Sequence, residues 1–186
     1  MTLLPSAEIS LGFLWKKIYQ QVHLALAEQK NSNNTFDFAL SFPCYNDKVF
    51  PLGDCVRIFS SSKESFERLN INKWLEQVQD YILLNEVTST PDEVKQFATF
   101  KRKQFKSNVA RLARRYAKRK GIDFEEALKH YEDFSEQETK LPFINVKSLS
   151  SNNEMKIFIL QEFKNEKING EFNAYGLSKT ATVPWF

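Results

Sequence analysis

Residues 101–120 are the most constraining segment of this chain, because they contain ten lysines and arginines and no acidic residue. The whole chain has 26 basic and 23 acidic residues, which leaves 16 basic against 23 acidic side chains elsewhere. The protein is therefore a mildly acidic body that carries one concentrated cationic element. Such an element requires a polyanionic partner.

The basic segment has the periodicity of an α-helix. Ser107 or Asn108 can cap its start, Gly121 can end it, and Leu112 and Tyr116 lie on an apolar flank that allows it to dock. Five cations recur at the spacing of one helical face: Arg111, Arg114, Arg115, Lys118 and Arg119. The pattern predicts an ordered helix with a charged face.

Nucleic acid is the partner that best fits this face. A solvated surface helix would normally interleave glutamate with lysine, and this segment contains no glutamate. A membrane surface is disfavoured because no face rich in Trp, Phe or Leu opposes the arginines.

Composition predicts a folded cytoplasmic protein. A hydrophobic content of 42%, with 17 Phe, argues against disorder. No apolar run approaches the ~20 residues of a membrane span, and no signal peptide is recognisable. Cys44 and Cys55 are too few for a disulfide framework, and His23 and His130 form no cluster with metal-site spacing. We expect reduced thiols, no metal and no cofactor.

The hydrophobic periodicity predicts an α+β fold. Its first half reads β-α-β-β-α-β, the ferredoxin-like order that RNA-recognition modules also use, with a truncated first strand. The predicted elements are a strand stub at 1–5, a helix at 11–29 capped by Ser10, strands at 35–42 and 55–59, a helix at 61–80 and a strand at 81–87.

Turn-forming residues at 88–93 predict a division into two domains, a ferredoxin-like domain at 1–88 and an RNA-binding region at 95–186. In the second region, Asp123 and Glu126 have capping-box spacing for a short helix after the arginine-rich one. The remainder predicts short antiparallel strands within 141–150, 154–163, 171–179 and 182–186.

Three motifs, in this order, resemble the CRISPR repeat-processing endoribonucleases of type I-F systems, the Csy-type members of the Cas endoribonuclease group. They are R-x-Q-x-K-S-N at 102–108 before the arginine helix, LPF…KSLS at 141–150, and the closing AYGLSK…VPWF. The similarity runs from QVHLALAEQ at 21–29 to the last residue.

The resemblance implies an enzyme that binds the stem-loop of CRISPR repeat RNA and cleaves at its 3′ base without metal. It implies 5′-hydroxyl and 2′,3′-cyclic phosphate products. The enzyme would be a monomer when isolated. It would then stay bound to the mature crRNA and join other Cas subunits in a type I-F surveillance complex.

The resemblance also implies catalytic roles. By itself, a histidine on a helix flank is more often a bystander than a catalyst, but His23 matches the family's catalytic histidine and suits the task of accepting the 2′-OH proton. Ser148 would hold the ribose 2′-OH, Ser150 would support it, and Tyr175 would orient the histidine. His130 matches no motif and is interpreted as a surface residue.

The implied RNA contacts begin with Arg102 and Gln104 as readers of base edges, a chemistry that suits guanine and adenine. Met155 stands where the family usually has a stacking aromatic residue, which predicts weaker cover of the terminal base pair. Lys118 replaces a typical arginine and loses bidentate geometry. The full expected set adds Lys106, Asn108, Arg111, Arg114, Arg115 and Arg119, with Arg115 and Arg119 nearest the cut.

Two other functions stay open. A non-catalytic hairpin-RNA-binding subunit of the same fold would need only the basic helix, and a duplex-DNA binder could use the same arginines. The joint presence of His23, Ser148 and Tyr175 favours the enzyme.

Overall fold

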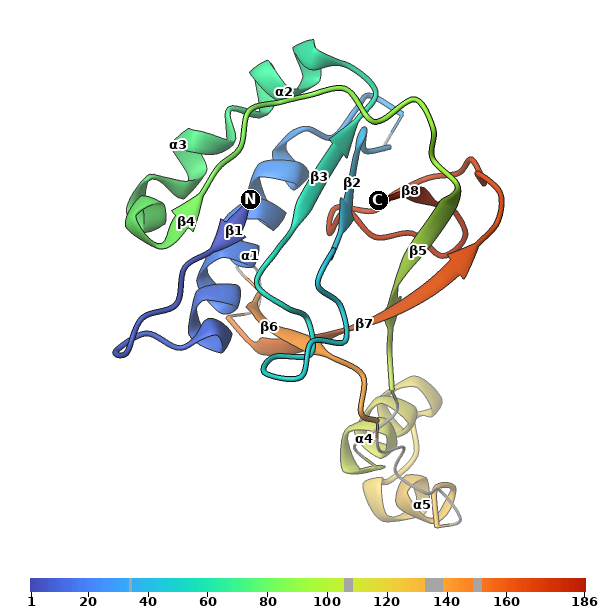
Figure 1. Cartoon of the computed structure of the whole chain (residues 1–186). Coiled ribbons are helices and arrows are strands. Elements are labelled where there is room, and N and C mark those ends of the chain that lie inside the picture. Colours follow the sequence, from blue (N-terminus) through green and yellow to red (C-terminus); the bar gives the residue numbers. More distant parts are fainter. Residues whose placement is uncertain (34, 106–108, 133–138, 149–151) are drawn as a thin grey trace. The chain divides into compact units, whose positions relative to one another are not determined.

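The computed structural model describes residues 1–33, 35–105, 109–132, 139–148 and 152–186 (Figure 1). Spatial contacts divide the chain into unit 1, residues 1–103 and 141–186, and unit 2, residues 104–140. The predicted α+β class is confirmed by the mixture of helices and small antiparallel sheets. The predicted domains at 1–88 and 95–186 remain a prediction. Among the described residues, no helix is long and apolar enough to cross a membrane.

Helix α1, Leu11–Glu28, is the longest helix among the described residues of unit 1. Ser10 caps it as predicted, because its side chain accepts a hydrogen bond from the Phe13 amide. One face packs into the core, where the Trp15 indole also donates to the Gly53 carbonyl at 2.7 Å. The buried residues of α1 are Leu14, Trp15, Ile18, Tyr19, Val22, Ala25 and Leu26.

The N-terminal strands form two short antiparallel pairs. Strand β1, Thr2–Leu3, pairs with β4, Ile82–Leu83, and β2, Phe38–Ser41, pairs with β3, Arg57–Ser60. An isolated antiparallel bridge between Thr2 and Cys55 connects the two pairs. The first strand is as short as the sequence predicts.

The single helix predicted at 61–80 is wrong, because Asn70 takes a left-handed backbone conformation with φ of 42° that interrupts it. Asparagine tolerates this conformation better than most residues. The segment forms α2 at Lys63–Leu69, α3 at Ile71–Leu75 and the 3₁₀ helix η1 at Glu76–Tyr81. The strand predicted at 81–87 shortens to the two residues of β4.

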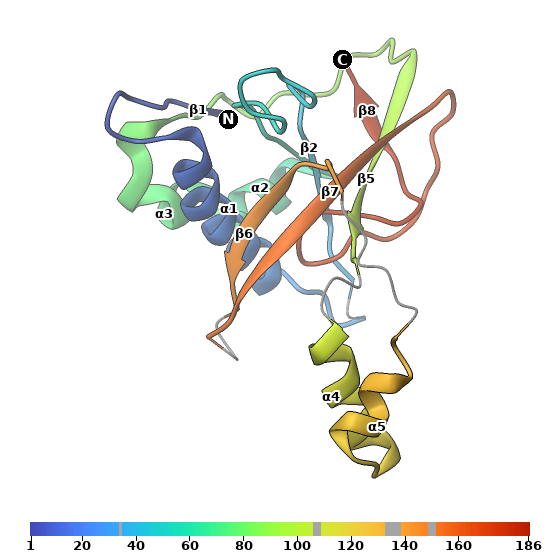
Figure 2. The same cartoon turned by 90° about the horizontal axis from the view of Figure 1, so that it is seen from below.

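A four-stranded antiparallel sheet in the order β6-β7-β5-β8 completes unit 1. Figure 2 shows β7 running between β5 and β6, with α1 against β6. The strand predicted within 171–179 is wrong, because these residues form turns around Gly176. The strands are β5 at Gln96–Lys103, β6 at Phe143–Lys147, β7 at Glu154–Lys164 and β8 at Val183–Trp185.

Unit 2 contains α4, Val109–Lys120, and α5, Phe124–Lys129, which pack on each other. The predicted end signal of α4 is confirmed, since Gly121 has a φ of 68° and its amide donates to the Ala117 carbonyl. Asp123 caps α5, as predicted. His130 is exposed, as predicted, and stacks on Tyr116 with 4.5 Å between ring centroids.

Candidate active site

The imidazole of His23 is held against a turn that follows from far along the chain. Its Nδ1 lies 2.8 Å from the carbonyl oxygen of Ala174. A carbonyl oxygen can only accept, so Nδ1 must carry the hydrogen of this bond. In the neutral ring, Nε2 is then the nitrogen with the free lone pair, which is the form that a proton acceptor needs.

The side chains of Tyr175 and Arg102 form a layered stack over this histidine. The rings of His23 and Tyr175 are nearly parallel, with 4.0 Å between centroids and 11° between planes. The guanidinium of Arg102 lies 5.0 Å from the centroid of the Tyr175 ring, within cation–π range. Both Arg102 and the Tyr175 hydroxyl also approach the sulfur of Met155, at 3.7 and 4.0 Å.

The turn at residues 173–176 presents Tyr175 to the helix. The Asn173 side chain accepts a hydrogen bond from the Tyr175 amide at 2.8 Å, and Gly176 has a φ of 68°. The Gly176 carbonyl then accepts from the Leu40 amide at 2.8 Å, which ties the turn to β2. The Tyr19 hydroxyl, one helical turn before His23, donates to the Tyr175 carbonyl at 3.1 Å.

The environment lowers the pKa of His23 below its ordinary value. Partial burial is the largest cause, because it penalises the charged ring; the bond to Ala174 opposes it, and the positive charge of Arg102 adds to it. The neutral, proton-accepting form of His23 is therefore favoured near pH 7. Burial likewise raises the pKa of the Tyr19 hydroxyl, so it remains protonated and donates.

Ser148 follows the last residue of β6, and its amide donates to the Asn153 carbonyl at 2.9 Å. The preceding residue, Lys147, donates its amide hydrogen to the side-chain oxygen of Gln20 at 2.9 Å. Gln20 lies on α1, three residues before His23. Sequence reasoning missed Gln20, because a half-buried glutamine inside an amphipathic helix carries no recognisable signal.

The structure therefore brings together several of the predicted site residues in unit 1. The side chain of His23 contacts Tyr175, Tyr175 contacts Arg102, and Arg102 contacts Met155. Ser148 directly follows Lys147, whose amide is hydrogen-bonded to α1. Gln104 is exposed and begins unit 2. The remaining predictions at Lys106, Asn108 and Ser150, and the predicted cap at Ser107 or Asn108, lie outside the described residues.

The predicted basic face of α4 is exposed to solvent. Ala113 is fully buried on the opposite flank, as the apolar pattern predicts. Two of the arginines lie over aromatic rings, Arg114 over Phe124 at 5.7 Å and Arg119 over Tyr116 at 5.5 Å. The exposed cations are Arg111, Arg114, Arg115, Lys118, Arg119 and Lys120.

Comparison with known proteins identifies the family. The chain matches the family described as CRISPR-associated protein (Cas_Csy4) over residues 1–186. This chain belongs to the Cas_Csy4 family. A protein of Escherichia coli (strain UTI89 / UPEC) named CRISPR-associated endonuclease Cas6/Csy4 is 36% identical over 185 residues, 99% of this chain and 96% of that protein. A protein of the same name from Pseudomonas aeruginosa (strain UCBPP-PA14) is 31% identical over 188 residues, with the same coverage.

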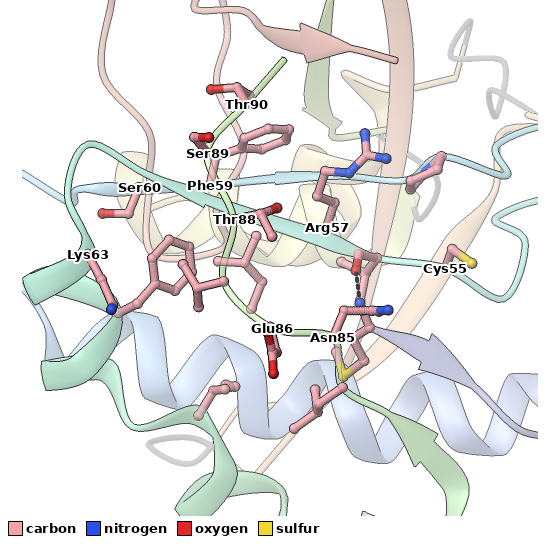
Figure 3. Close-up of a pocket in the computed structure, with 18 of the residues that line it drawn as sticks. Cys55, Arg57, Phe59, Ser60, Lys63, Asn85, Glu86, Thr88, Ser89 and Thr90 are labelled. Carbon is pink, nitrogen blue, oxygen red and sulfur yellow. Dashed lines mark hydrogen bonds between the residues drawn. The ribbon is translucent and has the colours of Figure 1, made fainter. Parts of the chain in front are cut away.

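A pocket of about 810 Å³ in this Cas_Csy4 chain lies elsewhere in unit 1. It is formed between β3 and residues 84–90, and Figure 3 shows Arg57 and Lys63 among the hydroxyl side chains that line it. Within the described residues, its lining includes none of His23, Ser148 and Tyr175. The predicted site is therefore separate from this pocket.

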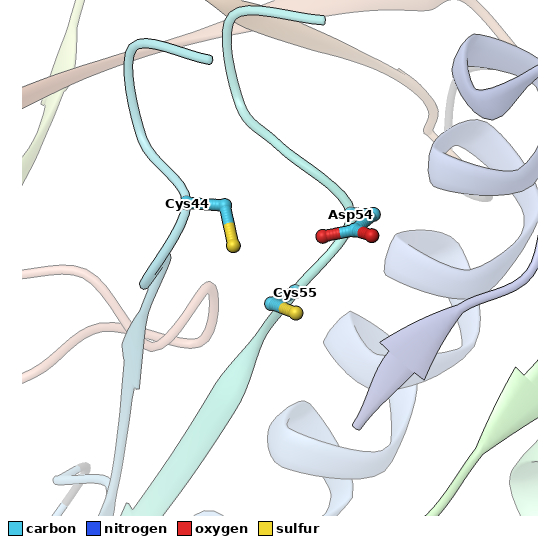
Figure 4. A group of neighbouring side chains, drawn as sticks. All are labelled: Cys44, Asp54 and Cys55. Atoms are coloured by element: carbon cyan, nitrogen blue, oxygen red, sulfur yellow. The ribbon is translucent and has the colours of Figure 1, made fainter.

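The two cysteines of this Cas_Csy4 chain are free and lie beside a carboxylate (Figure 4). Ligand atoms of Cys44, Asp54 and Cys55 lie within 4.8 Å of one another, a grouping that the sequence spacing did not predict. Burial, followed by the neighbouring Cys55 thiol, raises the pKa of the Cys44 thiol above its usual value. Cys44 therefore stays protonated near neutral pH, the form that binds metal least well.

Proposed function

We propose that this chain is a metal-independent endoribonuclease that binds the stem-loop of CRISPR repeat RNA and cleaves at the 3′ base of the stem. Membership of the Cas_Csy4 family and the endonuclease names of its relatives support this function. The observation that carries it is the His23 geometry, in which Nδ1 is occupied by Ala174 and Nε2 is left as a base.

In the proposed reaction, the ribose 2′-oxygen attacks the adjacent phosphorus. His23 takes the 2′-OH proton at Nε2, the O2′–P bond forms and the P–O5′ bond breaks. The products are a 2′,3′-cyclic phosphate and a 5′-hydroxyl, whose oxygen takes up a proton. Ser148 would hold the 2′-OH, with Ser150 supporting it, and Tyr175 would orient the imidazole through the stack.

Recognition is assigned to the basic elements. Arg102 and Gln104 would read base edges near the foot of the stem, and Met155 would cover the terminal base pair. An A-form stem hides its major groove from side chains, so a helix can enter it only near the end of a short hairpin. The phosphate clamp would comprise Lys106, Asn108, Arg111, Arg114, Arg115, Lys118 and Arg119.

The proposed context is a ferredoxin-like fold in a surveillance complex. The β4–β1 and β3–β2 pairings and the bridge from Thr2 to Cys55 support the ferredoxin-like order β4-β1-β3-β2. Isolated, the chain would be a cytoplasmic monomer. In the cell it would retain the mature crRNA and assemble with other Cas subunits of a type I-F system.

One cleavage assay tests the function. The protein is incubated in EDTA with a repeat hairpin and with the same RNA carrying a 2′-deoxy sugar just upstream of the cut. We expect cleavage of the all-ribose RNA alone, because the deoxy sugar lacks the attacking oxygen. Binding of both RNAs without cleavage would instead assign a non-catalytic hairpin-binding subunit. Tighter binding of the matching DNA duplex would assign a DNA-binding protein.

The rate of cleavage is expected to depend on pH through His23. Since its lowered pKa keeps the ring neutral, the single-turnover rate should be constant near pH 7 and fall only below the ordinary histidine pKa of about 6.5. The measurement is the rate at saturating protein between pH 5 and 8, alongside an NMR titration of the His23 ring. A rate that keeps rising well above pH 7 would contradict the assignment.

Replacing Arg115 with alanine is expected to weaken RNA binding and reduce its salt dependence. Removing one phosphate contact should lower the slope of log affinity against log salt by about 1. Filter binding at several salt concentrations measures it. Arg68→Ala, the loss of an exposed arginine on α2, is the matched control and should change neither value. Equal slopes for Arg115→Ala and the unmodified protein would remove Arg115 from the clamp.

A further inference from the structure

Two neighbouring pairs of side chains on α1 bond to the two segments that carry the proposed site, the turn at residues 173–176 and the β6–β7 hairpin. Tyr19 and His23 bond to the turn at residues 173–176. Lys16 and Gln20 bond to the β6–β7 hairpin, through Glu154 at 2.5 Å and the Lys147 amide at 2.9 Å. Residues three and four apart share one side of a helix, so one side of α1 contacts both segments.

The bond from Lys147 to Gln20 satisfies a group that the sheet leaves open. Strand β6 is the first strand in the order β6-β7-β5-β8, so within the described part of the chain one of its sides has no neighbouring strand. Backbone amides on that side need another acceptor. The Gln20 side-chain oxygen supplies one at Lys147, the last residue of β6 and the residue directly before Ser148.

We propose that Gln20 is a positioning residue that sets the placement of Ser148 relative to His23. This inference rests on the proposed function. The bond lies one residue from Ser148 and three residues from His23 along the chain, closer to both than the Lys16–Glu154 ion pair between the same two elements. In-line attack needs the 2′-OH held by Ser148 to face Nε2 of His23 within hydrogen-bond reach.

The neighbouring Lys16–Glu154 ion pair links the same two elements but does not have this role. Its side chains are 38% and 60% exposed, and exposed ion pairs contribute little because solvent screens them. Lys16 also lies two helical turns from His23. It therefore provides a control that breaks a contact between α1 and the hairpin without touching the Lys147 amide.

The test compares three variants of the full chain in EDTA with the repeat hairpin. Gln20→Met keeps length and helix propensity but removes the oxygen acceptor, Gln20→Glu keeps an oxygen acceptor, and Lys16→Met is the control. At saturating protein, we expect Gln20→Met to slow single-turnover cleavage by about tenfold or more, since misplacement by 1 Å can cost a hundredfold. Its RNA dissociation constant should stay within about twofold, whereas Gln20→Glu and Lys16→Met should cleave at nearly the original rate.

Two results would overturn the inference: an unchanged rate for Gln20→Met at saturation, with or without weaker binding, or equal slowing by Gln20→Met and Gln20→Glu. Hydrogen exchange of the Lys147 amide tests the link without any cleavage. It should accelerate in Gln20→Met and be restored in Gln20→Glu. If the unmodified protein exchanges slowly at Lys147 but does not cleave, the proposed function fails while the hydrogen bond between Gln20 and the Lys147 amide stands.

Discussion

Replacing His23 with alanine is expected to abolish cleavage of the repeat hairpin while leaving RNA affinity nearly unchanged. The variant removes the Nε2 lone pair that the Ala174 bond leaves free, and the loss of a positioned general base typically costs about 10²–10⁴ in rate. Affinity should persist because the exposed cations of α4 are untouched. Single-turnover cleavage at saturating protein and a separate binding titration measure the two effects.

The other histidine of the chain is the matched control. His130 is exposed and stacks on Tyr116 in unit 2, so His130→Ala should cleave at the original rate at saturating protein. A large loss of affinity in His23→Ala with a normal rate at saturation would move His23 from catalysis to binding. Equal inactivation by both variants would point to a general loss of structure, which circular dichroism would detect.

Replacing Gly176 with alanine is expected to cause a large loss of stability. The residue has a φ of 68°, and an added Cβ would lie 2.4 Å from Cγ of Leu40 and 3.1 Å from the Leu40 amide nitrogen. The left-handed conformation and the overpacking together predict a loss of about 2–5 kcal/mol in the free energy of unfolding. Because Gly176 follows Tyr175, the remaining folded protein should also cleave more slowly.

Gly121 separates the two causes. It has the same φ of 68°, but an added Cβ there would meet no atom of the described residues within 4 Å. Gly121→Ala should therefore lose only about 1–2 kcal/mol, the cost of the backbone conformation, and should retain cleavage at saturating protein. Urea unfolding followed by circular dichroism measures both variants. Equal losses would mean that Leu40 moves aside at no cost.

Local signals predicted the helical elements best. Ser10, Asp123 and Gly121 bond to backbone groups within a few residues of themselves, so their roles are visible in the chain order alone. The break at Asn70 was missed, because asparagine in a helical pattern is compatible with both a continuous helix and a left-handed stop. The strand β5 was missed because its residues run directly into the basic segment.

The candidate site was predicted as residues but not as an arrangement. The motif resemblance selected His23, Ser148 and Tyr175. The residue pattern at 171–179 assigned Tyr175 to a strand, whereas the residue sits in a turn. The stack of Arg102 on Tyr175 joins residues 73 positions apart in the chain, and the bond between Gln20 and Lys147 joins residues 127 positions apart. No local pattern encodes such pairs.

The sequence by itself determined that the chain carries a basic helix, that this helix has one charged face, and that the chain resembles repeat-processing endoribonucleases. These properties follow from residue type and helical spacing, which act over a few residues. Only the tertiary structure decided that His23 presents Nε2, because the Ala174 carbonyl that occupies Nδ1 comes from 151 residues away. The tautomer of His23 depends on which backbone group lies beside Nδ1, and the packing of α1 against distant segments decides which group that is.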